Sequence, residues 1–345
     1  MATASEIVAT PTELHSPLRD SHNRAITDLR VSITDRCNYK CVYCRTGQVG
    51  AQYAELSAAE YLRFIRIFVS LGIKKVRLTG GEPLLRRDLI AIVRELSAMR
   101  TPTGQPLDIA VTTNGHLLES LASPLKAAGL SRVTVSMDAV NPEVFERITR
   151  IHGSFPTVLR GIRAAQQAGF RRIKINCVLL RGFNDDQIEA FGHFARNEDV
   201  IVRFIEFMPL EEDRLWSPEM VVPLREIVDR LNTIAPLHPL MPNAPSETAR
   251  RYGFADGRGE IGIIAPVTQA FCGACSRIRL TSDGNIRTCL FSHREHDLYG
   301  PMRRGAGDDE LRELILSATR QKEARHHIGE PGFLKPSRSM VHIGG

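Results

Sequence analysis

The stretch Arg30–Cys44 reads RVSITDRCNYKCVYC, and it joins a short β-rich run directly to three closely spaced cysteines. The run 30–34 alternates in the way a half-buried β-strand does. Cys37, Cys41 and Cys44 then follow with C-x3-C-x2-C spacing. A closed structural metal site normally takes four protein ligands. The stretch therefore predicts a strand that ends in a metal site with one protein ligand missing.

The same alternation of strand and helix patterns recurs through the first 210 residues. Short β-rich runs occupy 30–34, 75–79, 109–113, 132–136, 172–178 and 201–205. Helical patterns occupy 57–71, 86–99, 116–128, 154–168 and 185–195, and several end at a glycine, namely Gly72, Gly129 and Gly169. Six such repeats predict parallel strands with right-handed crossovers. These repeats predict an α/β fold and leave an open sheet and a partly closed barrel as alternatives; the family resemblance given below implies a partial TIM-like (βα)6 barrel.

From about residue 208 the pattern changes, because prolines punctuate a loop-rich region with room for one or two helices. We expect this region to be a C-terminal appendage, and the second cysteine triad and the family resemblance given below imply that it is an iron–sulfur appendage. The chain is therefore divided into an N-terminal extension (1–24), the partial barrel (25–209) and a C-terminal domain (210–345). In a βα fold the functional side chains lie at the carboxyl ends of the strands, where the cysteines are also expected.

The composition is that of an ordinary globular protein, with 45 Lys and Arg against 39 Asp and Glu in 345 residues. No apolar run is long enough to cross a bilayer and no signal peptide is recognisable, so we expect a cytoplasmic protein without a membrane partner. No Lys/Arg run supports a nucleic-acid partner. The mild positive balance suits a pocket for a small polyanion.

Seven cysteines, an odd number, argue against a disulfide framework. Around the first triad no fourth Cys lies nearby in the sequence, and His22 and His116 are only formal candidates for a fourth zinc ligand. An iron–sulfur cube allows three irons to be held by thiolates while the fourth iron stays open. The spacing favours such a cluster and leaves zinc as the alternative.

A second triad, Cys272, Cys275 and Cys289, lies more than 200 residues further along the chain. It again offers three thiols, but His293 and His296 are close enough to act as zinc ligands. A zinc site therefore remains a stronger alternative here than at the first triad.

Basic residues stand inside apolar strand patterns at Arg30, Arg77 and Lys174. An unpaired cation is expensive in such a position, and a polyphosphate would pair it. The other single residues are expected to be structural or exposed: Cys177 as a small buried side chain, and His326 and His327 at the surface.

The C-x3-C-x2-C triad after the first strand, together with Gly80-Gly81-Glu82-Pro83 after the second, resembles the radical S-adenosylmethionine superfamily. The resemblance implies a 4Fe–4S cluster on Cys37, Cys41 and Cys44, with S-adenosylmethionine as the missing ligand of the open iron. It also implies contacts to that cofactor from Tyr43, Gly81, Ser136 and Met208.

The stretch 271–279 (FCGACSRIR), followed by Cys289-Leu290-Phe291 and a Gly344-Gly345 ending, resembles the GTP 3′,8-cyclase family, also called molybdenum cofactor biosynthesis protein A. The resemblance covers about residues 25–345. It implies a second 4Fe–4S cluster on Cys272, Cys275 and Cys289. It further implies GTP contacts from Arg30, Arg77, Thr112, Lys174, Arg277 and Arg279, and catalytic roles for Arg277, Arg279, Gly344 and Gly345.

The activity implied by this resemblance is the first step of molybdenum cofactor biosynthesis. A 5′-deoxyadenosyl radical removes the C3′ hydrogen of GTP, which becomes 3′,8-cyclo-7,8-dihydro-GTP. An electron donor of unknown identity, a cyclic pyranopterin monophosphate synthase that takes the product, and a homodimer are implied as partners. Two alternatives stay open, namely a radical enzyme that modifies a peptide and an iron–sulfur protein that only carries electrons.

Overall fold

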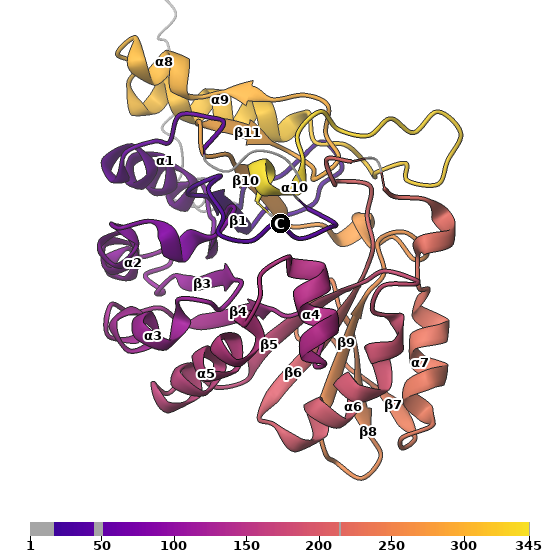
Figure 1. Cartoon of the computed structure of the whole chain (residues 1–345). Coiled ribbons are helices and arrows are strands. Elements are labelled where there is room, and N and C mark those ends of the chain that lie inside the picture. The colour runs from indigo at the N-terminus through magenta and orange to yellow at the C-terminus, as the bar shows by residue number, and fades with distance from the viewer. Residues whose placement is uncertain (1–16, 45–50, 214, 345) are drawn as a thin grey trace, which may run out of the picture.

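The structure is a computed structural model that describes residues 17–44, 51–213 and 215–344 (Figure 1). Its strands are β1 (Asp28–Ser32), β2 (Lys75–Thr79), β3 (Asp108–Thr113), β4 (Arg132–Ser136), β5 (Ile173–Leu179), β6 (Val200–Glu206), β7 (Leu237–Leu240), β8 (Arg250–Phe254), β9 (Glu260–Ile264), β10 (Arg277–Leu280), β11 (Asn285–Arg287) and β12 (His296–Asp297). Its α-helices are α1 (Ala58–Ser70), α2 (Leu89–Ala98), α3 (Leu118–Ala127), α4 (Pro142–Thr149), α5 (Ser154–Gln167), α6 (Ile188–Asn197), α7 (Leu224–Asn232), α8 (Tyr299–Arg303), α9 (Asp308–Arg320) and α10 (Met340–Ile343).

One sheet joins all the named strands of the described chain, in the order β12-β11-β10-β1-β2-β3-β4-β5-β6-β9-β8-β7. Pairing is parallel from β10 through β1–β6 to β9, and it is antiparallel at the two outer ends. Figure 1 shows α1, α2, α3 and α5 stacked along the outer side of β1–β5. The six strand–helix repeats expected from the sequence are therefore present, with strand limits that differ by at most two residues.

Local sequence explains where the helices begin and end. Ser57 caps α1, and Glu60 reaches back to the Ser57 backbone, which completes a reciprocal capping box. Each glycine expected to follow a helix has a positive φ: 102° at Gly72, 99° at Gly129 and 86° at Gly169. Helix α4 was not expected from the sequence, although Asn141 caps it and Pro142 occupies its first turn.

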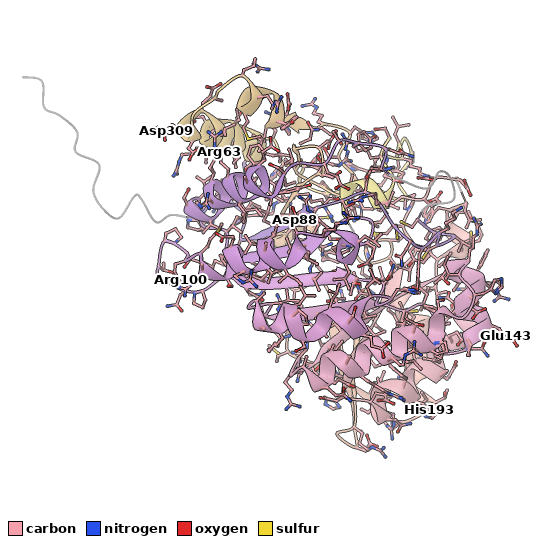
Figure 2. The ribbon with its side chains drawn as sticks, turned by 60° about the vertical axis from the view of Figure 1, so that its left-hand side comes forward. Arg63, Asp88, Arg100, Glu143, His193 and Asp309 are labelled. Carbon is pink, nitrogen blue, oxygen red and sulfur yellow. The ribbon has the colours of Figure 1, made fainter. Side chains whose placement is uncertain are left out.

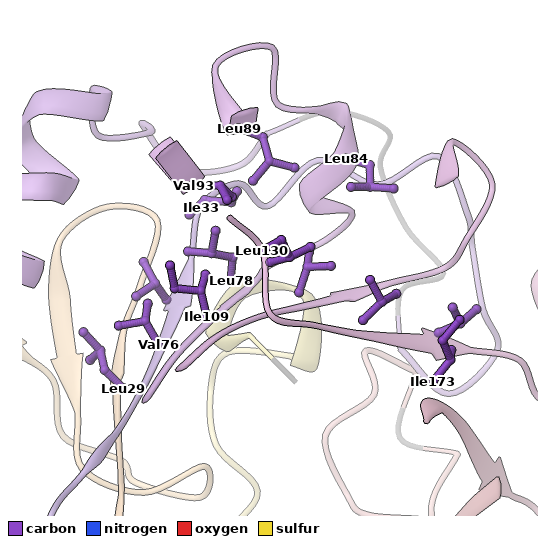
Figure 3. Packing of buried hydrophobic residues seen from close by; sticks show 14 of the residues in the cluster. Leu29, Ile33, Val76, Leu78, Leu84, Leu89, Val93, Ile109, Leu130 and Ile173 are labelled. Atoms are coloured by element: carbon purple, nitrogen blue, oxygen red, sulfur yellow. The ribbon is translucent and has the colours of Figure 1, made fainter. Parts of the chain in front are cut away.

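The core lies between the sheet and the outer helices (Figure 3). Leu29, Val76 and Ile109 stand in register on β1, β2 and β3, and none of them is more than 1% exposed. Val93 of α2 belongs to the same cluster. Burial of one such side chain stabilises the fold by roughly 1.5–3 kcal/mol. Because side chains alternate along a strand, the next residues, Arg30 and Arg77, must face the opposite side of the sheet.

The C-terminal region contributes strands to both ends of the parallel sheet. Strand β10 pairs with β1 and strand β9 pairs with β6. The described residues beyond 208 also hold the helices α7, α8, α9 and α10, so the region is richer in structure than the one or two helices expected. These strands are two to five residues long and lie among prolines, so they leave no periodic pattern to recognise.

Two further contacts join segments from the two parts of the chain to α1 or to the residue that follows it. Residues 17–24, assigned from the sequence to an N-terminal extension, are packed, since the Leu18 N–H donates to the Leu71 carbonyl. Figure 2 shows Arg63 of α1 near Asp309 of α9, and Arg63 Nε lies 2.8 Å from Asp308 Oδ1. In the described chain no helix is both long and apolar enough to cross a membrane.

Candidate functional site

All six cysteines of the two triads line one cavity of about 270 Å³. The first triad follows β1, while Cys272 and Cys275 precede β10 and Cys289 follows β11. Because β10 pairs in parallel with β1, the two triads meet although more than 200 residues separate them. All six thiols are half-buried, and none forms a disulfide. The cavity extends from the carboxyl end of β1, where the sequence predicts the first triad, to the amino end of β10, which Cys272 and Cys275 precede.

The loop of the first triad is held by backbone contacts to α4. The Lys40 N–H donates to the Thr149 carbonyl over 3.2 Å, and the Val42 N–H donates to the Ile148 carbonyl over 3.0 Å. Burial, with Asp138 and the neighbouring thiols, raises the pKa of Cys41. A buried neutral thiol in a fixed loop fits a site that loses its proton when a metal binds.

The second triad has an electropositive surround. Burial acts to raise the pKa of Cys275, but Arg277 and Lys322 outweigh it and lower that pKa to about 7. Arg277 Nη2 lies 3.3 Å from Cys275 Sγ, and Lys322 is only 3% exposed. Positive neighbours favour the thiolate, which is the form that binds iron.

The donor chemistry of both triads fits an iron–sulfur cluster. In the described ranges no three His, Cys, Asp or Glu side chains are gathered as ligands of one metal ion. A cluster does not require such convergence, because each thiolate binds a different iron. His293 and His296, the candidate zinc ligands, are not among the residues that line the cavity.

The four residues predicted to contact S-adenosylmethionine also line this cavity, namely Tyr43, Gly81, Ser136 and Met208. The Tyr43 hydroxyl donates to Asp138 Oδ2 over 2.8 Å. Burial raises the pKa of Asp138 to about 6, although the Val178 N–H and Tyr43 bond to the carboxylate and oppose the rise. The tyrosine beside the last cysteine is therefore fixed by a buried carboxylate.

The turn after β2 packs tightly against the chain that leads into the first triad. A Cβ at Gly81 would lie within 3 Å of the Arg36 backbone, so no larger residue fits there. Glu82 accepts hydrogen bonds from the Asn114 N–H over 2.6 Å and from the Thr113 hydroxyl over 2.7 Å. Burial raises the pKa of Glu82 to about 7, and these hydrogen bonds oppose the rise. Glu82 therefore joins the loop after β2 to the loop after β3.

A row of three arginines crosses the inner face of the sheet. Arg279, Arg30 and Arg77 stand in register on β10, β1 and β2. Burial and the neighbouring guanidinium groups lower the pKa of Arg30 and of Arg77 to about 9. Arg77 Nη1 donates to the Thr112 hydroxyl over 2.9 Å. Within the described chain none of these three arginines pairs with a carboxylate, so the row has the character of an anion site.

A second cavity, of about 460 Å³, adjoins the first. Arg30, Arg77, Arg203 and Arg277 line both cavities, whereas Lys174 lines only the second. Burial, followed by Arg203 and Arg132, lowers the pKa of Lys174 to about 8. The predicted GTP contacts therefore surround the junction of the two cavities.

The end of the chain lies against the same strands (Figure 1). Arg279 Nη1 donates to the Gly344 carbonyl and, over 3.4 Å, to the Ile343 carbonyl. Gly344 has a φ of 71°, and a Cβ there would lie 2.7 Å from Thr79 Cγ2. Gly344 is not itself a lining residue of either cavity, and Gly345 lies outside the described residues.

The structure adds residues that the sequence did not single out. His326 was expected at the surface, and that expectation is wrong: it is half-buried, lines the first cavity and packs on Phe291 with ring centroids 5.2 Å apart. No spacing pattern marked it. His327 is exposed and Cys177 is fully buried, both as expected. Arg203 and Lys322 also line the first cavity and were missed.

Solved structures with a similar fold share little sequence with this chain. Streptococcus suis SuiB bound to precursor peptide SuiA matches with a TM-score of 0.60 at 14% identity, over 92% of this chain and 76% of that one. Native anSMEcpe with bound AdoMet matches with a TM-score of 0.58 at 15% identity, over 86% of this chain and 81% of that one. The likeness shows a shared α/β fold.

Sequence comparisons are more specific. Residues 31–195 match the Radical SAM superfamily model, and residues 200–328 match the model named Molybdenum Cofactor Synthesis C. The GTP 3′,8-cyclase of Acidothermus cellulolyticus is 46% identical over 82% of this chain and 79% of its own length. That of Syntrophomonas wolfei is 40% identical over 94% and 99%. Molybdenum cofactor biosynthesis protein 1 of Drosophila melanogaster is 40% identical over 92% of this chain and 56% of its own length. With these identities over most of its length, the chain belongs to the GTP 3′,8-cyclase family.

Proposed function

We propose that this chain converts GTP to 3′,8-cyclo-7,8-dihydro-GTP, the first step of molybdenum cofactor biosynthesis, as a radical S-adenosylmethionine enzyme. The names of its relatives support the reaction. The observation that carries the proposal is that two cysteine triads share one cavity with a row of arginines that no carboxylate neutralises within the described chain.

The first triad would hold a 4Fe–4S cluster that S-adenosylmethionine completes. When bound, these groups supply the 5′-deoxyadenosyl radical that removes the C3′ hydrogen of GTP. The chain fixes the cofactor through Ser136, Met208 and the Gly81 backbone, while Tyr43 is held in place by Asp138. A primary carbon radical attacks almost any nearby C–H bond, so exact placement decides the product.

The second triad would hold a 4Fe–4S cluster whose open iron binds the guanine base. The arginine row and Lys174 would bind the triphosphate, with two-pronged contacts from the guanidinium groups. This placement would bring the ribose of GTP within reach of the radical supplied at the first triad. Buried cations suit a nucleoside triphosphate better than a neutral peptide, which disfavours the peptide-modifying alternative.

Several finer expectations belong to the same proposal. The division at about residue 209 follows from the change of sequence pattern, and the cytoplasmic location follows from the lack of a recognisable membrane span or signal peptide. The partial barrel with its C-terminal domain, a homodimer, an unidentified electron donor and a cyclic pyranopterin monophosphate synthase that takes the product follow from the family resemblance.

The test is anaerobic reconstitution with iron and sulfide, followed by incubation with GTP, S-adenosylmethionine and a reductant. Mass analysis should find the cyclised GTP product, together with 5′-deoxyadenosine whose formation GTP stimulates. About eight irons per chain are expected. Replacing Cys37, Cys41 and Cys44 by Ala should leave one cluster and no cleavage, whereas the same change at the second triad should leave one cluster and some uncoupled cleavage. Stoichiometric zinc at the second triad, or cleavage that GTP does not affect, would refute the proposal.

A further inference from the structure

A clamp around Arg338 holds the last residues of the chain. Its guanidinium group binds Asp283 through two contacts, of 2.8 and 3.0 Å, and Glu295 through a third of 2.7 Å. The same group stacks on the Tyr53 ring, 4.1 Å from the ring centroid. Its side chain is only 10% exposed. Such two-pronged, stacked and largely buried contacts fix an arginine far more firmly than a surface ion pair does.

Both carboxylates of the clamp belong to the region that carries the second triad. Asp283 lies in the turn between β10 and β11, and Glu295 also binds Arg287, at 2.6 Å. Arg287 stands in register with Arg279, the residue that donates to the carbonyl of Gly344. One hairpin therefore holds the end of the chain at two points, Arg338 and Gly344.

The aromatic side of the clamp belongs to the first triad. The Tyr53 ring contacts two residues of the tail, namely Arg338, which stacks on it, and His342, whose ring meets it edge-on with centroids 5.2 Å apart. The Tyr53 N–H donates to Asp35 Oδ2 over 3.0 Å, and Asp35 precedes Cys37 by two residues. The tail thus joins the segments that carry the two triads.

A single turn of helix separates the clamp from the end of the chain. Helix α10 spans Met340–Ile343, and the Met340 N–H donates to the Leu210 carbonyl over 3.0 Å. Because this turn is short and its Val341 and Ile343 side chains are buried, a shift at Arg338 is carried directly to Gly344.

We propose that Arg338 is a positioning residue, which docks the chain end on β10 so that Gly344 meets Arg279 beside the first cavity. This inference rests on the proposed GTP chemistry for its effect on turnover but not for its effect on docking. It goes beyond a role for the terminal glycines, because it assigns their placement to the Tyr53–Asp283–Glu295 clamp.

The first experiment measures docking alone. The reconstituted holoenzyme is treated with a carboxypeptidase under anaerobic conditions, and trimming of the tail is followed by mass spectrometry. In Arg338→Met we expect trimming to accelerate on the order of 10- to 100-fold, because charge-assisted hydrogen bonds are lost and trimming follows the undocked fraction. Arg338→Lys keeps the positive charge but loses the two-pronged contact. Its tail should therefore be trimmed faster than that of the unsubstituted enzyme and more slowly than that of Arg338→Met.

A matched control exists at Arg196, which also makes two contacts to one carboxylate, Asp256, and lies over an aromatic ring, Phe254. Arg196 lines neither cavity. Arg196→Met should leave trimming and turnover unchanged. If Arg338→Met does not fold, Asp283→Asn removes the same two-pronged contact from the other side.

The second experiment measures coupling. We expect Arg338→Met to form at least tenfold less cyclised GTP per 5′-deoxyadenosine, with the KM for S-adenosylmethionine and the iron content unchanged. Equal trimming rates in Arg338→Met and the unsubstituted enzyme overturn the proposal that the clamp docks the tail. Faster trimming with an unchanged product ratio overturns the positioning role. If the unsubstituted enzyme forms no cyclised GTP, the proposed function fails, yet the trimming comparison still decides whether the clamp docks the tail.

Discussion

Replacing Lys174 by Met should stabilise the ligand-free protein while weakening its binding of GTP. Lys174 is half-buried in the second cavity, and no carboxylate of the described chain forms an ion pair with its ammonium group. Burial, then Arg203 and Arg132, lowers its pKa from 10.5 to about 8. The folded state therefore disfavours this charge, and the cavity holds the lysine at a cost that a polyphosphate would offset.

The size of the effect follows from that pKa. At 1.36 kcal/mol per pKa unit, this pKa shift limits the free-energy cost of the buried charge to roughly 3 kcal/mol. Because solvent reaches part of the side chain, we expect a gain of about 1–2 kcal/mol in the free energy of unfolding. That gain corresponds to a rise in Tm of a few degrees, roughly 2–4 °C per kcal/mol. Loss of the cation should weaken GTP binding on the order of 10- to 100-fold.

The stability gained by Lys174→Met should depend on pH, and the lowered pKa of Lys174 fixes the direction of that dependence. Below about pH 8 both the folded and unfolded chains hold the proton, so the cost of the buried charge is fully present. Between pH 8 and 10.5 the unfolded chain binds more protons, so the stability contributed at this site rises with pH. The gain from Lys174→Met should therefore be largest at pH 7 and smaller at about pH 9.5.

The assay is denaturant unfolding of the ligand-free protein at these two pH values, with calorimetric titration of GTP at pH 7. Lys74→Met, at an exposed lysine just before β2, serves as the control and should show no pH-dependent gain. Destabilisation of Lys174→Met at pH 7, or a gain that does not shrink at high pH, would refute the reasoning. So would unchanged affinity for GTP.

Three further predictions concern other parts of the site. Gly344→Ala should abolish the cyclised product with iron content and Tm nearly unchanged, because a Cβ would lie 2.7 Å from Thr79 Cγ2; a full product yield by mass analysis contradicts this. Lys322→Met should make the midpoint potential of the second cluster more negative in an EPR redox titration, because a buried cation beside Cys289 favours the reduced cluster; an unchanged potential contradicts this. Glu82→Gln should reduce S-adenosylmethionine binding measured by equilibrium dialysis, because its hydrogen bonds fix the loop after β2; binding equal to that of the unsubstituted protein contradicts this.

The sequence predicted those parts of the site that have short-range signals. The spacing within each cysteine triad and the glycine pair at 80–81 follow one strand end each, so their position could be predicted. Arg203 carried the same signal as Arg30 and Arg77, a cation within an apolar strand, and alternation along β6 would have identified it. His326 carried none, because it reaches the cavity from an irregular segment after α9.

The pairing of β10 with β1 could not be predicted from local pattern. Strand β10 is four residues long, and parallel pairing leaves no hairpin turn to mark the partner. Arg277 and Arg279 are two residues apart, so any extended segment would place them on one side, but this spacing does not indicate which strand lies beside them. That long-range pairing brings the second triad to the first, so local sequence patterns could not predict that the two triads share one cavity.

The pairing of β10 with β1 also means that β1 is synthesised long before its second neighbouring strand. Asp28 and Ser276, which meet beside β1 and β10, are 248 residues apart in the chain. At typical synthesis rates of about 5–20 residues per second, β1 waits roughly 12–50 s for its second neighbour. During that interval one edge of a buried, parallel strand has no partner, which is a template for misassembly. A chaperone that shields this edge, or slower growth at lower temperature, should therefore raise the yield of properly folded enzyme more than added iron does.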